Sequence, residues 1–192
     1  SGYNYRLKGV QMGNPARDTH LEQTVRDGDF DLVVYSKCNV VSYKTFKYIN
    51  SLTTTCLWFM DPLVSYDEEL QTKTQLVDFA CFDKENVLSV AQQFNKNSFY
   101  VCEGFDSFVD KPYPEVQKQH DVSFIGNIYG QRQELLNSIH SQITVINNVY
   151  GFEHAKAVAA SKINLNFCTS GGASDRIYKI LGSQGFLISD DW

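Results

Sequence analysis

The chain has 192 residues, of which 43% are hydrophobic, 20% charged and 14% aromatic, with a formal net charge of −5 and a pI near 5.3. This composition is typical of a folded globular protein and excludes a disordered chain, and the length suits one large domain or two small ones. Because no run of Lys or Arg offsets the acidic balance, nucleic acid is excluded as the main partner.

Apolar runs bounded by turns predict four strands in the first half of the chain, at residues 30–36, 54–60, 79–82 and 99–102. Helical patterns between and before them fall at residues 19–26, 42–51, 65–76 and 84–94. Thr19 with Glu22 has capping-box spacing, and Ser42 is a candidate N-cap. The acidic residues Asp67, Glu68 and Glu69 suit the first turn of a helix that starts at Ser65.

Residues 107–120 are polar and contain two prolines, so they predict a linker and a domain boundary between residues 118 and 119. Alternation then restarts, with strands at 122–125, 143–146, 163–167 and 186–189. Helices are expected at 132–141 and 152–160, and a third begins near Ser174 or Asp175. The expected fold class is α/β, with two Rossmann-like parallel-sheet units, residues 1–118 and 119–192, and helices on both faces of each sheet.

The five cysteines are odd in number and form no CxxC pair. They are Cys38, Cys56, Cys81, Cys102 and Cys168. Most stand in apolar, strand-like contexts, where a free thiol behaves as a small hydrophobe. We expect free cysteines, a reducing compartment and a cytoplasmic location, since no signal peptide and no membrane-spanning run is visible.

The loop at residues 169–174 is the best candidate for an anion site, because a glycine-containing loop here feeds a helix N-terminus. Arg176 lies in the first turn of that helix, where a positive charge is unfavourable unless an anion is present. The alternative is an ordinary strand–helix connection with a surface arginine. Neither Walker A nor G-x-G-x-x-G spacing occurs.

Two further positions follow predicted strands, where ligands bind in α/β sheets. Gly126 would let a ligand approach the backbone and Arg132 would reach a phosphate, with a plain glycine turn as the alternative. Asp61 ends a buried strand and is a candidate for accepting a proton from a sugar hydroxyl, with an N-cap as the alternative. The four histidines lack the spacing of metal ligands.

Taken together, the motifs resemble the GT-B glycosyltransferases of the spore-maturation CgeB-like group, related to the family-1 glycosyltransferase domain. The resemblance rests on order and spacing across most of the chain. The matching pieces are Asp31-Leu-Val-Val-Tyr35, Trp58-Phe-Met-Asp-Pro62, Gly104-Phe-Asp106, Asp121-Val-Ser-Phe-Ile-Gly126 with Arg132, Val149-Tyr-Gly151, Lys162-Ile-Asn-Leu-Asn166, Arg176-Ile-Tyr-Lys179 and Gly185-Phe-Leu-Ile188.

The resemblance implies metal-independent transfer of a sugar from a UDP-, GDP- or dTDP-sugar to an acceptor hydroxyl. The donor would sit on the C-terminal domain and the acceptor, a glycan or other hydroxyl compound, on the N-terminal side. No cofactor is expected beyond the nucleotide-sugar itself. The implied catalytic residues are Asp61 and Arg176. The implied donor-binding residues are Gly126, Asn127, Arg132, Tyr150, Gly151, Thr169, Ser170, Gly171, Gly172, Asp175, Arg176 and Lys179.

Two departures keep a second function open. Lys179 stands where many members of the group carry a Glu that binds ribose or donor-sugar hydroxyls. The chain is also short for a GT-B enzyme, as expected for one module of a longer protein. The alternative is therefore a non-catalytic module that binds nucleotide-sugars or carbohydrate. A flavodoxin- or receiver-like interaction domain is less compatible with two strand–helix runs.

Overall fold

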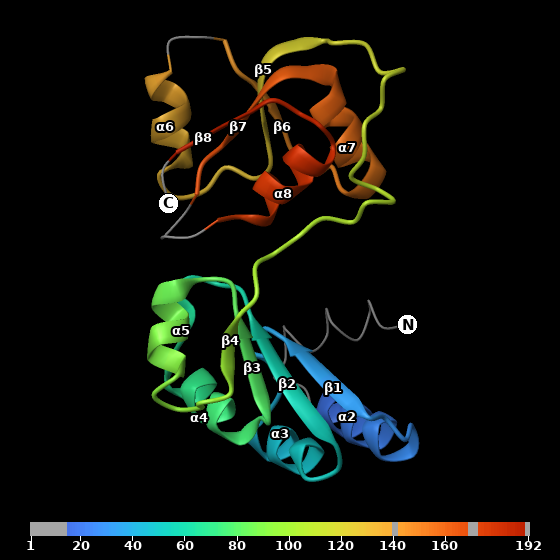
Figure 1. Cartoon of the computed structure of the whole chain (residues 1–192), viewed down its shortest axis with the longest axis vertical. Helices are drawn as coiled ribbons and strands as arrows, with labels where there is room; N and C mark the ends of the chain where they lie inside the picture. The colour runs from blue at the N-terminus through green and yellow to red at the C-terminus, as the bar shows by residue number, and fades with distance from the viewer. Residues whose placement is uncertain (1–14, 140–141, 169–172, 191–192) are drawn as a thin grey trace. The chain divides into compact units, whose positions relative to one another are not determined.

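A computed structural model describes residues 15–139, 142–168 and 173–190, which form parts of two compact units divided between Cys102 and Glu103 (Figure 1). Within these residues each unit has one sheet of four strands, and every strand pair is parallel. The structure thus confirms the α/β fold class with two Rossmann-like units. Each unit is described separately below.

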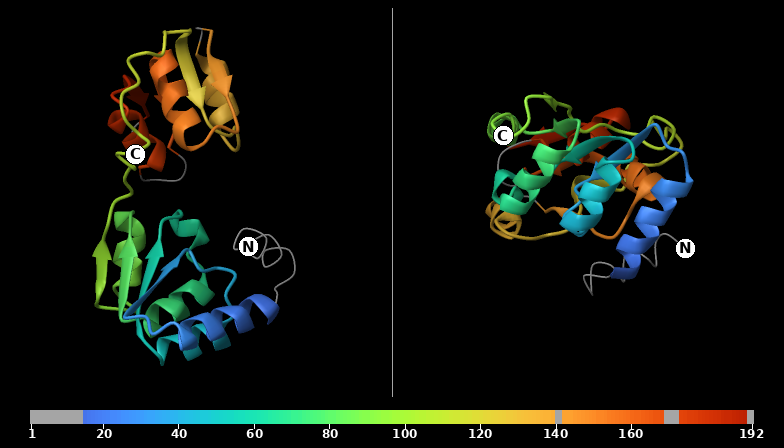
Figure 2. Two further views of the ribbon diagram at one scale, coloured as in Figure 1. Left: turned by 90° about the vertical axis from the view of Figure 1, so that its right-hand side faces the viewer. Right: turned by 90° about the horizontal axis from the view of Figure 1, so that it is seen from below.

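In the first unit each new strand of the sheet is added on the same side of the strand before it. Its elements are α2 (Pro15–Asp27), β1 (Leu32–Ser36), α3 (Tyr43–Asn50), β2 (Thr54–Phe59), the 3-10 turn η1 (Leu63–Ser65), α4 (Glu68–Leu76), β3 (Phe79–Phe82), α5 (Glu85–Ala91) and β4 (Ser98–Tyr100). The strand order is β1-β2-β3-β4. Because parallel crossovers are right-handed, steps in one direction leave the crossover helices on the same face of the sheet, as Figures 1 and 2 show.

One apolar core fills the space between these helices and the sheet. It contains Tyr35, Leu57, Phe59, Ala80 and Phe82 from the strands, and Val25, Phe46, Ile49, Leu70, Val87 and Ala91 from the helices. On the opposite face of the sheet Leu32, Val34 and Phe79 are 49%, 53% and 42% exposed. The expectation of helices on both faces is therefore wrong for the described part of this sheet, because the winding never reverses.

Side-chain caps fix the starts of two helices in the first unit. Ser42 caps α3 as predicted, since its hydroxyl accepts a hydrogen bond from the Thr45 amide at 3.3 Å. Asp67 caps α4 by accepting from the Leu70 amide at 2.9 Å. The helix predicted to begin at Ser65 therefore starts three residues later, and Asp67 precedes it.

The capping box predicted at Thr19 is wrong, because α2 already begins at Pro15 and Thr19 lies within it. Proline is well suited to a first helical turn, since its missing amide hydrogen has no partner there in any case. Glu22 has a different role from the one expected. Its carboxylate accepts a hydrogen bond of 2.6 Å from the Thr45 hydroxyl and so ties α2 to α3.

The second unit reverses its winding at β5. Its elements are β5 (His120–Ile125), α6 (Arg132–Ser138), β6 (Thr144–Ile146), α7 (Gly151–Ala160), β7 (Ser161–Asn166), α8 (Asp175–Gly182) and β8 (Leu187–Ser189). The strand order is β6-β5-β7-β8, so the chain first moves to one side of β5 and then to the other. The reversal places α6 on one face and α7 and α8 on the other (Figure 1).

Two cores result, one on each face of the second sheet. Phe124, Leu136, Leu165 and Phe167 pack on the α6 side. Ile125, Val158 and Ile180 pack on the side of α7 and α8. Here the expected covering of both faces is confirmed, and the middle strands β5 and β7 are largely buried.

The segment before β5 packs with the second unit, although the sequence placed it before the domain boundary. A Cβ atom on Gly182 would lie 2.5 Å from the Phe105 ring, so this ring sits directly on α8. Phe108 and Phe152 contact each other edge to face, with ring centroids 5.7 Å apart. The chain accordingly divides after Cys102, sixteen residues before position 118.

Candidate anion-binding site

The reversal of winding creates a switch point in the strand order beyond the ends of β5 and β7. The hydrogen-bonded register of these two strands ends at the pair Phe124 and Leu165. After that pair, the chain from β5 leads to α6 on one face and the chain from β7 leads to α8 on the other. Ligands in open α/β sheets bind at such a switch point, outside the carboxyl ends of the strands.

Arg176, in the first turn of α8, reaches back over the end of β5. Its Nε donates to the Ile125 carbonyl and its Nη1 to Asn166 Oδ1, both at 2.7 Å. The guanidinium lies over the Phe124 ring, 4.8 Å from the centroid. Burial lowers the pKa of Arg176, and the positive charge of Arg132 adds to that effect.

Gly126 makes room for this arginine. Its φ of +144° is a conformation that side chains other than glycine rarely adopt, and a Cβ there would lie 2.5 Å from Arg176 Nη2. The sequence predicted a close approach to the Gly126 backbone by a ligand. In the structure the group that makes the close approach is the Arg176 guanidinium.

Arg132, the first residue of α6, reaches the same edge from the other face of the sheet. It is 3% exposed. Its Nη1 donates to the Asn127 carbonyl at 3.1 Å and its Nη2 to the Phe167 carbonyl at 3.3 Å. The guanidinium lies 4.1 Å from the centroid of the Tyr129 ring and 5.8 Å from that of Phe124. Its buried Nε has no hydrogen-bond partner among the described residues.

The two arginines bring two positive charges to this end of the sheet. Across residues 15–139, 142–168 and 173–190 neither guanidinium makes an ion pair, and every acceptor they use is a neutral oxygen. A buried charge is costly unless it is neutralised. The edge of the sheet between β5 and β7 is therefore suited to an anion.

Asn166, the last residue of β7, is a polar centre that the sequence did not single out as a site residue. Its fully buried Oδ1 accepts hydrogen bonds from Arg176 Nη1 and from the Ser174 hydroxyl, the latter at 2.9 Å. Ser174 is the N-cap of α8, but its side chain does not cap the helix. The available signal was a polar residue at the end of an apolar strand, which is unfavourable without a specific partner.

The remaining predicted donor-binding residues are placed as follows. Thr169, Ser170, Gly171 and Gly172 lie outside the described residues. Asp175 and Lys179 form an ion pair of 2.6 Å one helical turn apart on α8. Burial opposes ionisation of Asp175, but the hydrogen bond from Lys179 together with the charges of Lys179, Arg176 and His154 outweighs it, and the pKa of this carboxyl is lowered.

Tyr150 and Gly151 begin α7, at the end of the sheet to which β6 leads. Tyr150 is 73% exposed, and Gly151 has a φ of +53°. Among the described residues, neither of them forms a hydrogen bond or a ring contact with the arginines. His154, one turn further on, has a buried Nδ1 without a partner in the described part of the chain, and burial lowers its pKa.

Asp61 belongs to the first unit, where it follows β2. Its Oδ1 forms an ion pair with Lys37 Nζ at 2.6 Å, and Lys37 follows β1. Pro62, and not Asp61, occupies the N-cap position of η1. The two strand ends therefore present a partly exposed carboxylate next to an ammonium group.

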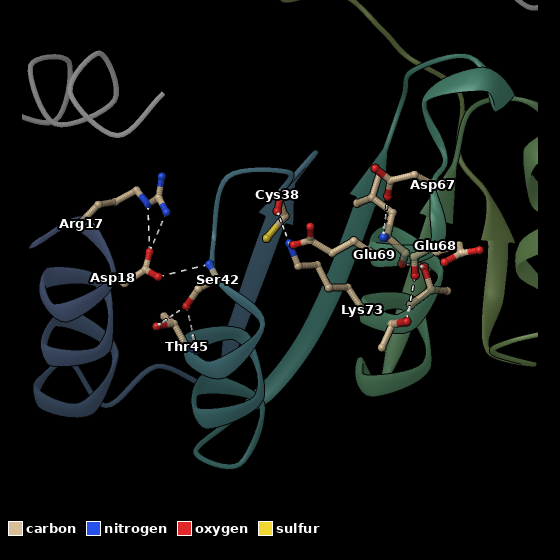
Figure 3. A network of polar contacts seen from close by, with 12 residues as sticks. Arg17, Asp18, Cys38, Ser42, Thr45, Asp67, Glu68, Glu69 and Lys73 are labelled. Atoms are coloured by element: carbon tan, nitrogen blue, oxygen red, sulfur yellow. Dashed lines mark hydrogen bonds and ion pairs between the residues drawn. The ribbon is translucent and has the colours of Figure 1, made fainter. Parts of the chain in front are cut away.

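The turn after β1 is held in an unusual conformation. Lys37 and Cys38 have φ angles of +65° and +62°, in the left-handed region. Lys73, fully buried on α4, donates to the Cys38 carbonyl at 3.1 Å and pairs with Glu69 at 2.6 Å (Figure 3). Burial raises the pKa of the Cys38 thiol to about 12.

No three His, Cys, Asp or Glu side chains within the described ranges come together as a metal-binding group. None of the helices in those ranges is both long enough and apolar enough to span a bilayer.

Comparison with known proteins gives a likeness of fold. No protein-family model and no curated protein matches the sequence. Among solved structures, the chain is similar to one described as accessory secretory protein 1, 2 and 3 in Streptococcus pneumoniae, with a TM-score of 0.55 and 9% identity over 93% of this chain and 44% of that chain. A second structure, described as a GtfA/B complex bound to UDP and GlcNAc, gives a TM-score of 0.47 and 11% identity over 90% and 46% of the two chains.

The first of these likenesses supports the tandem α/β fold, and the identity is too low to carry function. The chain spans less than half the length of either solved structure.

Proposed function

We propose that the second unit binds the diphosphate of a nucleotide-sugar beyond β5 and β7, and that the chain acts as a glycosyltransferase. One observation carries the proposal. Two guanidinium groups arrive from helices on opposite faces of the sheet, lie over the same Phe124 ring and, among the described residues, donate hydrogen bonds only to neutral oxygens. A diphosphate supplies the missing negative charge together with several acceptor oxygens.

In the proposed reaction the acceptor hydroxyl oxygen bonds to the anomeric carbon of the sugar. The bond from that carbon to the diphosphate oxygen breaks, and its electron pair stays on the diphosphate. Arg176 Nη2 and the first amide groups of α8 stabilise the charge that develops there. The proposal gives this role to a guanidinium and a helix end, and Asp61 is the base that takes the hydroxyl proton.

The order of motifs supports the finer assignment to the CgeB-like group. Gly126, Arg132, Asn166 and Arg176, which the resemblance drew on, all contribute to one edge of the second sheet. The acceptor is then a glycan or other hydroxyl compound, and a cytoplasmic location remains part of the proposal.

A binding module without transferase activity is the second candidate function. Lys179 is paired with Asp175, so the described part of α8 offers no free carboxylate at the position where related enzymes bind donor hydroxyls. Under this alternative the chain binds a nucleotide-sugar but transfers nothing.

A thermal-stability panel of UDP-, GDP- and dTDP-sugars tests the proposal. A ligand at 100 times its Kd stabilises a protein by about 2.7 kcal/mol, which is a readily measured rise in Tm. We expect Arg176→Ala to abolish the rise. Arg26→Ala is the matched control, since Arg26 is an exposed arginine on α2 of the first unit. If no nucleotide-sugar raises the Tm of the wild type, the proposal fails.

Release of the nucleotide then separates the two candidates. A transferase releases nucleotide from its donor when an acceptor is present, whereas a binding module gives the rise in Tm without release.

A further inference from the structure

We propose that Arg132 is a positioning residue, which ties the loop after β5 to the end of β7 and so shapes the anion site, and that the anion itself is bound by Arg176. The inference rests on the proposed function in one respect, namely that the edge between β5 and β7 is where the anion binds. It changes the role that the sequence suggested for Arg132, which was a direct phosphate contact.

The first step is that both terminal nitrogens of Arg132 already donate hydrogen bonds, while its Nε is buried without a partner among the described residues. One terminal nitrogen is bonded to the Asn127 carbonyl and the other to the Phe167 carbonyl, and the planar group is stacked on Tyr129. With 3% of the residue exposed, an anion would have to displace these bonds to reach it. Arg176, in contrast, has Nη2 lying against Gly126 without a hydrogen bond to any described residue.

The second step is that the two carbonyls belong to the segments that follow two different strands, β5 and β7, at the point where the sheet opens. The ladder between β5 and β7 stops at Phe124 and Leu165. Asn127 and Phe167 lie beyond that pair, where the two segments diverge towards opposite faces. The fork of Arg132 joins them with two hydrogen bonds from two different nitrogens, whereas the single nitrogen of a lysine would have to lie within reach of both carbonyls at once.

The third step links this pair of hydrogen bonds, which we call the Arg132 brace, to Arg176. Gly126 stands between Ile125, whose carbonyl accepts from Arg176 Nε, and Asn127, whose carbonyl accepts from Arg132 Nη1. A shift of Asn127 therefore moves Gly126 against the Arg176 guanidinium. The guanidinium already lies so close to Gly126 that a Cβ atom on this residue would not fit. The brace has an electrostatic cost, because the charge of Arg132 contributes to the lowered pKa of Arg176.

The test compares Arg132→Lys with Arg132→Gln. If Arg132 acts by positioning, lysine keeps the charge but loses the pair of hydrogen bonds from two separate nitrogens, so both variants lose affinity for pyrophosphate and UDP to a similar degree. If Arg132 binds the anion directly, lysine restores much of the affinity that glutamine loses. Lys162→Gln is the control, since it removes an exposed positive charge from β7 of the same unit.

A second readout needs no ligand. The Gly126 amide donates to the Ile146 carbonyl and the Cys168 amide to Asp190, so hydrogen exchange at these two amides reports on the two segments that Arg132 joins. We expect exchange at both amides to be about tenfold faster or more in both Arg132 variants, from the loss of two hydrogen bonds. Unchanged exchange in these variants would overturn the inference, as would rescue of affinity by lysine.

The two proposals fail in different ways. If wild-type protein binds neither pyrophosphate nor UDP, the proposed function is wrong, and the exchange rates at Gly126 and Cys168 still decide whether Arg132 is a brace.

Discussion

Replacement of Gly126 by alanine tests the geometry of the anion site most directly. Alanine at a φ of +144° costs about 1–3 kcal/mol in backbone strain. The new Cβ would also lie 2.5 Å from Arg176 Nη2, so the guanidinium must move and weaken its bonds to Ile125 and Asn166. Hydrogen bonds to charged groups contribute about 1.5–3 kcal/mol each, and partial loss of two gives a total of about 2–5 kcal/mol.

The assay is native-state hydrogen exchange at increasing urea, read at the amides of β5 and β7, because these report on the second unit alone. Gly104→Ala is the matched control. A Cβ on Gly104 meets nothing within 4 Å, and its φ is not in the positive region. We expect this control to change stability by less than about 0.5 kcal/mol.

A double-mutant cycle with Arg176→Ala separates the two causes. Without the guanidinium, the cost of Gly126→Ala should fall to the backbone part alone, which gives a coupling of about 1–2 kcal/mol. If Gly126→Ala costs the same in both backgrounds, contact with Arg176 is not the reason for the glycine. If it costs no more than Gly104→Ala, the whole reasoning fails.

Three further predictions concern the first unit. Ser42→Ala removes the cap of α3 and should cost about 1 kcal/mol in a urea titration, while Ser42→Asp keeps most of it. Lys73→Ala opens a cavity and leaves the Cys38 carbonyl without its hydrogen bond, so we expect the free energy of unfolding to fall by about 2–4 kcal/mol. A fall of less than about 1 kcal/mol would contradict a stabilising role for the bond from Lys73 to Cys38 shown in Figure 3. The pKa of the Cys38 thiol is about 12 in the folded protein and about 8.5 in the unfolded chain. The contribution of this thiol to the free energy of unfolding is therefore complete below about pH 8.5 and is lost as the pH rises towards 12. Cys38→Ala should flatten this alkaline decline in stability, and an equal decline in both proteins would refute the assignment.

Much of the architecture follows from the sequence alone. Apolar runs such as residues 54–60 and 163–167 predict buried parallel strands, and the structure has β2 and β7 there. The strand–helix alternation predicts two Rossmann-like units, because only a parallel sheet needs a helix between successive strands. The Ser42 cap was also predictable, since the signal and its partner lie three residues apart.

Features that depend on contacts between distant residues could not be predicted from local sequence patterns. The helix start at Pro15 was missed because Thr19 and Glu22 fit a local capping pattern, whereas the bond from Thr45 recruits Glu22 from 23 residues away. The predicted domain boundary at residue 118 relied on the prolines and the polar side chains of residues 107–120. The packing of Phe105 on Gly182 joins the preceding segment to the second unit.

The candidate site shows the same division. The sequence picked out Gly126, Arg132 and Arg176 by residue type and by their position after strands, and the structure brings all three to one edge of the second sheet. Residue type alone does not say what each one does. Only the strand order β6-β5-β7-β8 decides that the two arginines come from opposite faces, and only the packing decides that Arg132 is enclosed between backbone carbonyls while Arg176 lies against a glycine. Hydrogen bonds between segments some 35 or 51 residues apart depend on the register of neighbouring strands, which no local pattern in the chain specifies.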